Sequence, residues 1–515
     1  MTRTHRFLGG LSLGYVSLAL ATVVGLWLTP FLLARIGTHD YGLWLITTQI
    51  LGYLMLMDLG VVALAPRETA YATGRRLQGG ADEVDATFAR FRTIVRWQLI
   101  PAALAAVVAW WVVAVQWPEL RLPLAIILAA FLLAFPFRLY HATLQGLQDL
   151  PYLGKVQLAA WTAGMVTTVS LMLLDAGLAA LATGWVVTQA VTAGACAWRL
   201  RQRFSSMWRA KPSRATLSDA RELFGRSGWI SLAQIGQVFL NGSDVLVLGA
   251  IFGPAATVPY ACTAKLITVL SNHPQLLMQA AAPAIAEMRT SAARAKLVRV
   301  AVSLMRAMLI LSGAVACFVL AANESFVSWW VGPEQFAGWS LTILMLVVML
   351  ARHFATTLTY ALFSFGHERR LSLTAIADGV VALGVTAGLA WFTDLGLASA
   401  AVGSLAGVLL INIPVSSTAL ARELGISVVE LVASLRGWAI RFAAAATICL
   451  FAARLIPSSG PASVVTAGLL VAVVYGGVMW PLALEDPLGP YVRSTLASIA
   501  AFLRPRRTPL VEPRP

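Results

Sequence analysis

The sequence predicts an all-α polytopic membrane protein. Of its 515 residues, 59% are hydrophobic and 12% are charged, whereas soluble domains have about 25% charged residues. The mean hydropathy is +0.77, and apolar stretches long enough to span a bilayer follow one another along the chain. These observations exclude a soluble fold. We therefore attribute the net charge of +15 to loops at one membrane face, and expect no nucleic-acid partner.

Fourteen apolar segments are long enough to cross the membrane as helices. The first is too long for a cleaved signal peptide and has no small-residue cleavage site, so we expect it to be retained. The predicted spans are residues 10–34, 41–65, 94–117, 122–144, 153–174, 177–198, 227–251, 257–285, 300–322, 337–363, 371–392, 396–420, 437–456 and 462–482.

The basic residues predict the orientation of these spans. If the N-terminus is cytoplasmic, 31 of the 38 Lys and Arg residues fall in cytoplasmic segments and three fall in outer loops. Basic residues accumulate in short cytoplasmic loops of membrane proteins. We therefore expect both termini to lie in the cytoplasm. The remaining four basic residues lie within predicted spans.

The chain also repeats itself. Asp175-Ala-Gly-Leu-Ala-Ala, at one predicted turn, resembles Asp394-Leu-Gly-Leu-Ala-Ser at another, with an offset of 219 residues. Six predicted helices separate the two turns, so both copies have the same orientation in the membrane. We predict an N-terminal six-helix lobe over residues 1–210 and a C-terminal six-helix lobe over 211–436. Residues 437–515 supply two additional helices and a cytoplasmic tail.

The segment Ser227–Gly249 is apolar but has polar residues along one face at helical spacing. A polar face is costly in hydrocarbon, so it indicates either hydrogen bonds to neighbouring helices or a water-filled cavity. Its position directly after the basic segment between the lobes favours a cavity, facing the first lobe. The polar positions are Ser227, Ser231, Gln234, Gln237, Asn241 and Asp244.

Ionisable residues within spans are candidate functional residues. A cavity with basic side chains would suit an anion, and a diphosphate group in particular. The predicted diphosphate-binding residues are Lys265, Arg352, Arg138 and Arg306, and the predicted polar face of the cavity consists of Gln234, Gln237, Asn241 and Gln275. Asp244 and Asp378 are the candidates for coupling to H⁺ or Na⁺.

Simpler interpretations stay open for several of these residues. Arg306 is close enough to a helix end for its side chain to reach the cytoplasmic surface. Asp244 could serve only as the ion-pair partner of Lys265. Asp58, at the predicted cytoplasmic end of the second span, is expected to cap a helix or to pair locally.

Motifs of enzymes are absent from the sequence. It contains no P-loop, no HExxH and no paired-cysteine metal site. The predicted outer loops are too short for the catalytic domain of a membrane glycosyltransferase, ligase or polymerase. We therefore expect no enzymatic activity, no metal and no cofactor besides a coupling ion.

Several short motifs resemble bacterial polysaccharide-export flippases. They comprise Pro30, Arg35-Ile-Gly37, Tyr41-Gly-Leu-Trp44 and Asp58-Leu-Gly60 within Trp27–Ala70, then Asp244, Gly249, Gly253 and Tyr260, and finally Gly366-His-Glu-Arg and Asp394-Leu-Gly-Leu. These flippases belong to the multidrug/oligosaccharidyl-lipid/polysaccharide superfamily. Lipid II flippases of that superfamily have a first helix richer in Arg and Asp than this one.

The resemblance implies a V-shaped pair of six-helix lobes around a central cavity, working by alternating access. It implies that undecaprenyl-diphosphate-linked oligosaccharide repeat units cross the bacterial cytoplasmic (inner) membrane for O-antigen, capsule or exopolysaccharide synthesis. Membrane lipids and the polysaccharide polymerase machinery are the other implied partners. The alternative is a cation-coupled exporter of drugs or metabolites from the same superfamily.

Overall fold

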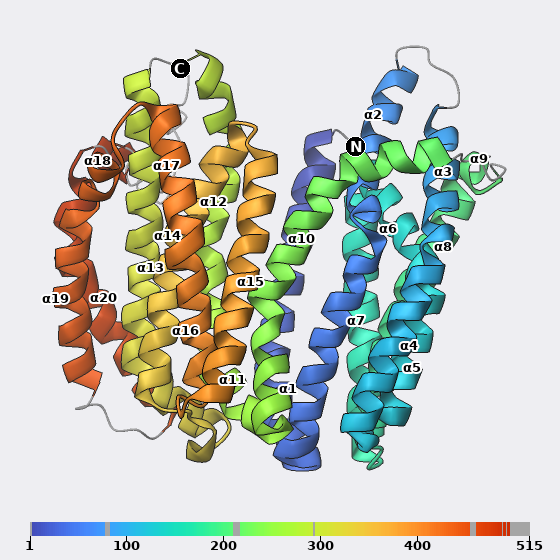
Figure 1. Ribbon diagram of the computed structural model, residues 1–515, viewed down its shortest axis with the longest axis horizontal. Coiled ribbons are helices and arrows are strands. Elements are labelled where there is room, and N and C mark those ends of the chain that lie inside the picture. Colours follow the sequence, from blue (N-terminus) through green and yellow to red (C-terminus); the bar gives the residue numbers. More distant parts are fainter. Residues whose placement is uncertain are drawn as a thin grey trace, which may run out of the picture. The chain divides into compact units, whose positions relative to one another are not determined.

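The computed structural model describes residues 3–77, 83–209, 217–291, 294–453, 460–486, 488–490 and 492–494. Within these residues the chain is helical throughout, and it forms no strand. Figure 1 shows long helices running roughly parallel within bundles. The predicted all-α polytopic fold is confirmed.

Contacts divide the chain into two compact units, and each is described by itself. The first unit comprises residues 1–262 and 372–407, and the second comprises residues 263–371 and 408–515. The helices of the first unit are α1 (Arg3–Met55), α2 (Val61–Leu77), α3 (Glu83–Trp97), α4 (Leu99–Gln116), α5 (Arg121–Ala134), α6 (Arg138–Gly146), α7 (Leu150–Leu173), α8 (Leu178–Arg203), α9 (Ser205–Arg209), α10 (Leu217–Phe252), most of α11 (Thr257–Thr263) and α15 (Glu368–Phe392), and α16 (Ala398–Gly407).

The second unit contains the remaining helices. A π-helical turn, Val408–Asn412, precedes its α17. Its helices are α12 (Lys265–Ser291), α13 (Arg294–Trp330), α14 (Trp339–Ser364), α17 (Ile413–Leu424), α18 (Val428–Ala433), α19 (Arg436–Ala453) and α20 (Pro461–Leu484).

Every predicted span falls on helix over most of its length. In the part of the chain that the structure describes, ten helices are long and apolar enough to cross a membrane, or up to twelve if each of two bent pairs is one span. The chain is therefore a multi-pass membrane protein. The count of fourteen and the predicted lobe boundaries at residues 210 and 436 stay predictions.

The first predicted span and residues 41–55 of the second lie within α1. The helix is interrupted at Gly37, which has φ 75° and ψ 174°. A side chain would be strained at a positive φ, whereas glycine is not. Gly37 therefore separates the predicted spans 10–34 and 41–65, as the sequence pattern indicated.

The two repeated turns have similar local structure. Gly177, before α8, and Gly396, before α16, have φ values of 54° and 55°. Gly184 and Gly403, also 219 residues apart, both lie where two helices approach closely. A Cβ on Gly184 would lie 2.8 Å from the carbonyl oxygen of Gly164, and one on Gly403 would lie 2.6 Å from that of Ala382. The hairpins α7–α8 and α15–α16 thus share a turn and a packing contact.

Because backbone approaches so closely at Gly184, replacing this glycine by valine should separate α7 from α8. We expect Gly184→Val to cost about 3 kcal/mol, the upper range for overpacking, and to lower the thermal stability of the detergent-solubilised protein. Gly194→Val is the matched control on α8, because a Cβ at Gly194 meets nothing within 4 Å. Equal melting temperatures for the two variants would contradict this packing.

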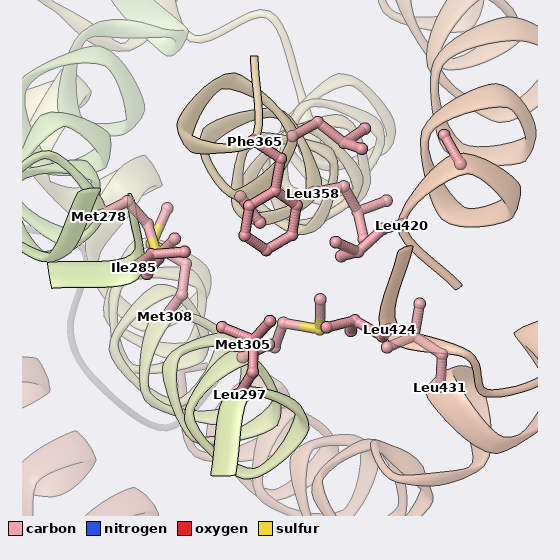
Figure 2. Packing of buried hydrophobic residues seen from close by; sticks show 14 of the residues in the cluster. Met278, Ile285, Leu297, Met305, Met308, Leu358, Phe365, Leu420, Leu424 and Leu431 are labelled. Atoms are coloured by element: carbon pink, nitrogen blue, oxygen red, sulfur yellow. The ribbon is translucent and has the colours of Figure 1, made fainter. Parts of the chain in front are cut away.

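The core of the second unit is formed by apolar side chains from five helices. In Figure 2, Met278 and Ile285 of α12 face Leu358 of α14, with Leu420 and Leu424 of α17 on the other side. Lipid tails are as apolar as these side chains, so close packing rather than exclusion of water stabilises such contacts. The cluster joins α12, α13, α14, α17 and α18.

The two predicted additional helices, α19 and α20, pack on α13 in the second unit. Six of the ten buried residues in their contact are alanine or cysteine, and such small residues allow close approach of helices in membranes. The Tyr475 hydroxyl on α20 donates to the Ile310 carbonyl of α13 at 2.6 Å. Cys317 and Cys449 are buried in this contact. Cys196 and Cys262 are buried elsewhere in the protein.

Candidate functional site

The helix of the second predicted span breaks at Asp58. Residues Leu56–Asp58 form a 3-10 turn, and Leu59 and Gly60 have φ values of 46° and 71°. The helix resumes at Val61 after a bend of 49° and continues to Leu77. Asp58 therefore ends the first helical segment of this span, and a second segment follows in a different direction. Left-handed backbone at two successive residues interrupts the helix, and hydropathy does not reveal it.

Four polar contacts stabilise this break. Its backbone N–H and C=O groups lose their helical partners and need others. The Gly60 N–H donates to Asp58 Oδ1 at 3.0 Å, and the Gln98 side chain donates to the Asp58 carbonyl at 2.7 Å. Arg138 donates to the Met55 carbonyl at 3.3 Å and pairs with Asp58 Oδ2 at 2.9 Å. Asp58 thus makes the expected local contact and also a distant ion pair.

Arg138 itself follows a 3-10 turn within another helical span, Pro118–Gly146. Phe135–Phe137 is a 3-10 turn containing Pro136, and α6 begins at Arg138. The guanidinium lies 5.7 Å from the centre of the Phe135 ring, within cation–π range. The Arg138 side chain is 25% exposed, whereas that of its partner Asp58 is 4% exposed. The ion pair therefore joins the break at Asp58 to the 3-10 turn before α6, and its cation is more exposed than its carboxylate.

A cavity of about 510 Å³ lies beside this ion pair, within the first unit. This volume is in the range of small-molecule sites. Five segments line it: the 3-10 turn at Asp58, α2, the α5–α6 region, α8 and α10. The polar lining residues are Asp58, Arg67, Arg138, His141, Gln145, Gln189, Thr192 and Gln234, and the others are Val62, Ala63, Pro66, Ala134, Phe137, Ala142 and Ala193.

The lining combines positive charge with neutral hydrogen-bonding groups. Two positive side chains, Arg67 and Arg138, and one negative side chain, Asp58, line the cavity. The Arg67 side chain is 52% exposed. Three glutamine amides and one threonine hydroxyl provide both donors and acceptors. The cavity is thus suited to an anionic group attached to a hydroxyl-rich or amide-bearing moiety. No group of three His, Cys, Asp or Glu side chains that could hold a metal ion occurs among the described residues.

The predicted polar face of α10 serves two purposes in the first unit. Gln234 lines the cavity, while Asp244 accepts a hydrogen bond from Tyr260 at 2.8 Å. Ser243, which is not one of the predicted polar positions, hydrogen-bonds the Tyr53 hydroxyl of α1 at 2.6 Å. Gln237 is exposed. The side chain of Asn241 lies outside the described residues. Both interpretations of this helix, a cavity wall and helix–helix hydrogen bonding, therefore hold for different residues.

Asp378 on α15 is completely buried in the first unit. Its carboxylate and backbone lie against Gly407 of α16, where a Cβ would lie 2.6 Å from the Asp378 carbonyl oxygen. The predicted role of Asp378 in ion coupling stays a prediction.

Four of the predicted binding residues belong to the second unit. Lys265 begins α12, with its ammonium 6.0 Å from the centre of the Trp330 ring. Arg352 and Gln275 are half-buried. The neighbour of Arg352, His353, is buried and lies 2.6 Å from the Ser312 hydroxyl. The roles of Lys265, Arg352 and Gln275 in substrate binding stay predictions.

Arg306 makes contacts that stabilise the second unit. Its Nε donates to the Ser434 carbonyl at 3.1 Å and its Nη1 to the Asp486 carbonyl at 2.7 Å. Ser434 directly follows α18, where helix geometry leaves carbonyls without a helical partner, and Asp486 lies two residues beyond α20. The contacts favour a structural role for Arg306 over the predicted diphosphate binding.

Sequence reasoning missed most of the polar cavity residues. Arg138, His141 and Gln145 are spaced three and four residues apart, and Gln189 and Thr192 are three apart. Such spacing puts side chains on one face of a helix. This spacing can be read from the sequence, but glutamine and threonine in an apolar helix indicate a binding site less strongly than charged residues do.

Comparison with known proteins gives a family match. The family model described as "Polysaccharide biosynthesis protein" matches residues 11–289, which is more than half of the chain and includes every residue of the cavity. The chain belongs to the polysaccharide biosynthesis protein family. A comparison with curated proteins gives no match.

Two solved structures show the fold of this polysaccharide biosynthesis family member. A lipid II flippase MurJ in an inward closed conformation is similar with a TM-score of 0.63 and 10% identity, over 92% of this chain and 99% of that one. A MATE protein in complex with MaD3S is similar with a TM-score of 0.51 and 15% identity, over 81% and 94%. At these identities the matches establish a shared fold.

Proposed function

We propose that this protein is a flippase for undecaprenyl-diphosphate-linked oligosaccharide repeat units, acting by alternating access in the synthesis of O-antigen, capsule or exopolysaccharide. The observation on which the proposal rests is the cavity of the first unit. This cavity combines the partly exposed side chain of Arg138 with amide and hydroxyl groups on α6, α8 and α10. The diphosphate would bind near Arg138, and the first sugars would contact the neutral groups.

The charge of the cavity supports an anionic substrate. Diphosphate oxygens accept charge-assisted hydrogen bonds from guanidinium groups, which present planar pairs of donors. Sugar hydroxyls donate and accept, so they suit Gln145, Gln189 and Gln234. The lipid tail would stay in the bilayer while this head group crosses.

The predicted topology supports entry from the cytoplasm. With a cytoplasmic N-terminus, Asp58 and Arg138 lie in the cytoplasmic half of their spans. A substrate assembled on the inner leaflet would meet the cavity there. This orientation is part of the proposal, as are a bacterial inner-membrane location, a coupling ion such as H⁺ or Na⁺, the absence of enzymatic activity and a link to the polysaccharide polymerase machinery.

A cation-coupled exporter of drugs or metabolites is the rival function, because a MATE protein has the same fold. An organic cation would be attracted by Asp58 but repelled by Arg67 and Arg138. Asp58 is 4% exposed and already paired with Arg138. The cavity therefore favours an anion over a cation.

Deletion of the gene in its own host tests the proposal. We expect surface polysaccharide to be lost and lipid-linked repeat units to accumulate on the cytoplasmic leaflet, with recovery when the wild-type chain is supplied. Normal surface polysaccharide together with increased sensitivity to organic cations would contradict the proposal and support the exporter.

A further inference from the structure

We propose that the Asp58–Arg138 ion pair is an anion-sensitive latch. In its closed state it holds the break in the second predicted span against α6, and an anion bound at Arg138 in the cavity weakens it and frees that break. The inference rests on the proposed function for the nature of the anion, a diphosphate, but concerns what binding does to the protein.

The first argument is the position of the two residues. Asp58 ends the 3-10 turn Leu56–Asp58, and Arg138 directly follows the 3-10 turn Phe135–Phe137. Helix breaks are where a membrane helix most easily changes direction. The break at Asp58 is such a point, and the ion pair anchors it to the continuous span Pro118–Gly146.

The second argument is that Arg138 supports the broken backbone directly. It donates to the Met55 carbonyl at 3.3 Å and pairs with Asp58 Oδ2 at 2.9 Å. Met55 precedes the 3-10 turn and Asp58 ends it. If Arg138 turns away, the break loses two of its four polar contacts. Those of Gly60 and Gln98 with Asp58 remain.

The third argument is the asymmetry of exposure. Arg138 lines the cavity with 25% of its side chain exposed, while the Asp58 side chain is 4% exposed. A ligand in the cavity can therefore reach the guanidinium without displacing the carboxylate first. A phosphate group offers more negative charge and more acceptor oxygens than a carboxylate, so it competes for the same cation.

The surrounding charges do not provide a substitute partner for Asp58. Arg67 also lines the cavity, but it lies 3.9 Å from Glu68 and its side chain is 52% exposed. His141, one turn after Arg138 on α6, is the other titratable side chain of the lining. Binding of an anion thus weakens the attraction that holds Asp58 against α6, and α2 gains freedom relative to α1.

Hydrogen exchange of the full-length protein in nanodiscs tests the latch, with inorganic pyrophosphate as the probe. Saturating pyrophosphate should accelerate exchange in peptides covering residues 56–66 about threefold or more, because local opening governs exchange. Calorimetry on the same sample measures binding. Pyrophosphate that binds without changing this exchange would overturn the latch, and so would the absence of any binding.

Two variants sharpen this test. Asp58→Asn removes the charge of the latch, so exchange over residues 56–66 should be fast without pyrophosphate and should respond little to it. Asp149→Asn is the matched control, because it disrupts another ion pair of the first unit, with Arg199 at 2.7 Å, outside the cavity lining. It should respond to pyrophosphate like the wild type, and the same loss of response in both variants would overturn the assignment. The wild-type titration needs no variant, so the test stands even if Asp58→Asn fails to fold.

The latch and the proposed function can fail separately. A protein that binds pyrophosphate and opens at residues 56–66, but does not move lipid-linked glycans, keeps the latch and loses the flippase function. A flippase whose exchange at residues 56–66 ignores pyrophosphate keeps its function and loses the latch.

Discussion

Arg138→Gln is expected to lower glycan transport about 100-fold at equal membrane levels. A hydrogen bond to a charged group contributes about 1.5–3 kcal/mol, and about 1.4 kcal/mol corresponds to a factor of ten. Glutamine keeps some donor capacity but removes the charge that would face the diphosphate. Transport is measured as the glycan that reaches the outer leaflet per unit time.

The same substitution should also destabilise the protein, because it leaves Asp58 buried without its cation. Removing one partner of a buried pair costs about 3 kcal/mol or more. The double variant Asp58→Asn with Arg138→Gln should recover most of this stability and none of the transport. Full transport by the double variant would show that Arg138 only compensates Asp58 and does not bind substrate.

Arg199→Gln is the matched control for Arg138→Gln. Arg199 pairs with Asp149 at 2.7 Å and lies 4.4 Å from the centre of the Tyr152 ring, so it resembles Arg138 in having an ion pair and an aromatic contact. It does not line the cavity. Its replacement should reduce stability without a matching loss of transport per folded molecule. Equal transport losses at the two arginines would contradict a specific role for Arg138.

Gly146→Val is expected to distort the cavity. Gly146 on α6 faces α2 so closely that a Cβ would lie 2.5 Å from the Pro66 carbonyl oxygen and 2.7 Å from the Thr69 Cβ. Valine must push α2 away from α6, at a cost of about 3 kcal/mol. Because Arg67 lies on α2 and Gln145 on α6, the cavity changes shape as well. We expect a lower melting temperature in detergent and less than about a tenth of wild-type transport.

The control for Gly146→Val is Gly52→Val on α1, where a Cβ meets nothing within 4 Å. Gly52→Val should keep its melting temperature and most of its transport. A Gly146→Val protein with wild-type melting temperature and activity would mean that α2 and α6 are not packed as described.

Much of the fold followed from hydropathy and charge. Apolar length and period predict helices in a membrane protein because every backbone polar group must be paired within the segment. The break at Asp58 could not be predicted in this way, because it depends on Leu59 and Gly60 adopting left-handed backbone. Asp58 and Arg138 are 80 residues apart in the sequence, and their pairing is set by tertiary packing.

The candidate site was only partly predicted, because the sequence does not show which residues tertiary packing brings together. Arg138 and Gln234 were named from charge or polarity inside an apolar span, and the structure places both at the cavity. Gln145, Gln189 and Thr192 were missed because each is unremarkable by itself. Arg306 was named for its charge, yet its hydrogen bonds go to carbonyls just beyond α18 and α20. Charge identifies residues that need partners, and only packing shows what the partners are.

Transport by the purified protein in proteoliposomes is the most direct test of the central claim. The vesicles would contain an undecaprenyl-diphosphate-linked oligosaccharide, and a membrane-impermeant glycosidase added outside would report the molecules that have crossed. The account predicts time-dependent cleavage of the inner-leaflet pool with the wild type, and little above empty vesicles with Arg138→Gln. An inner pool that stays protected with folded wild-type protein, under imposed H⁺ and Na⁺ gradients of either direction, would contradict the account.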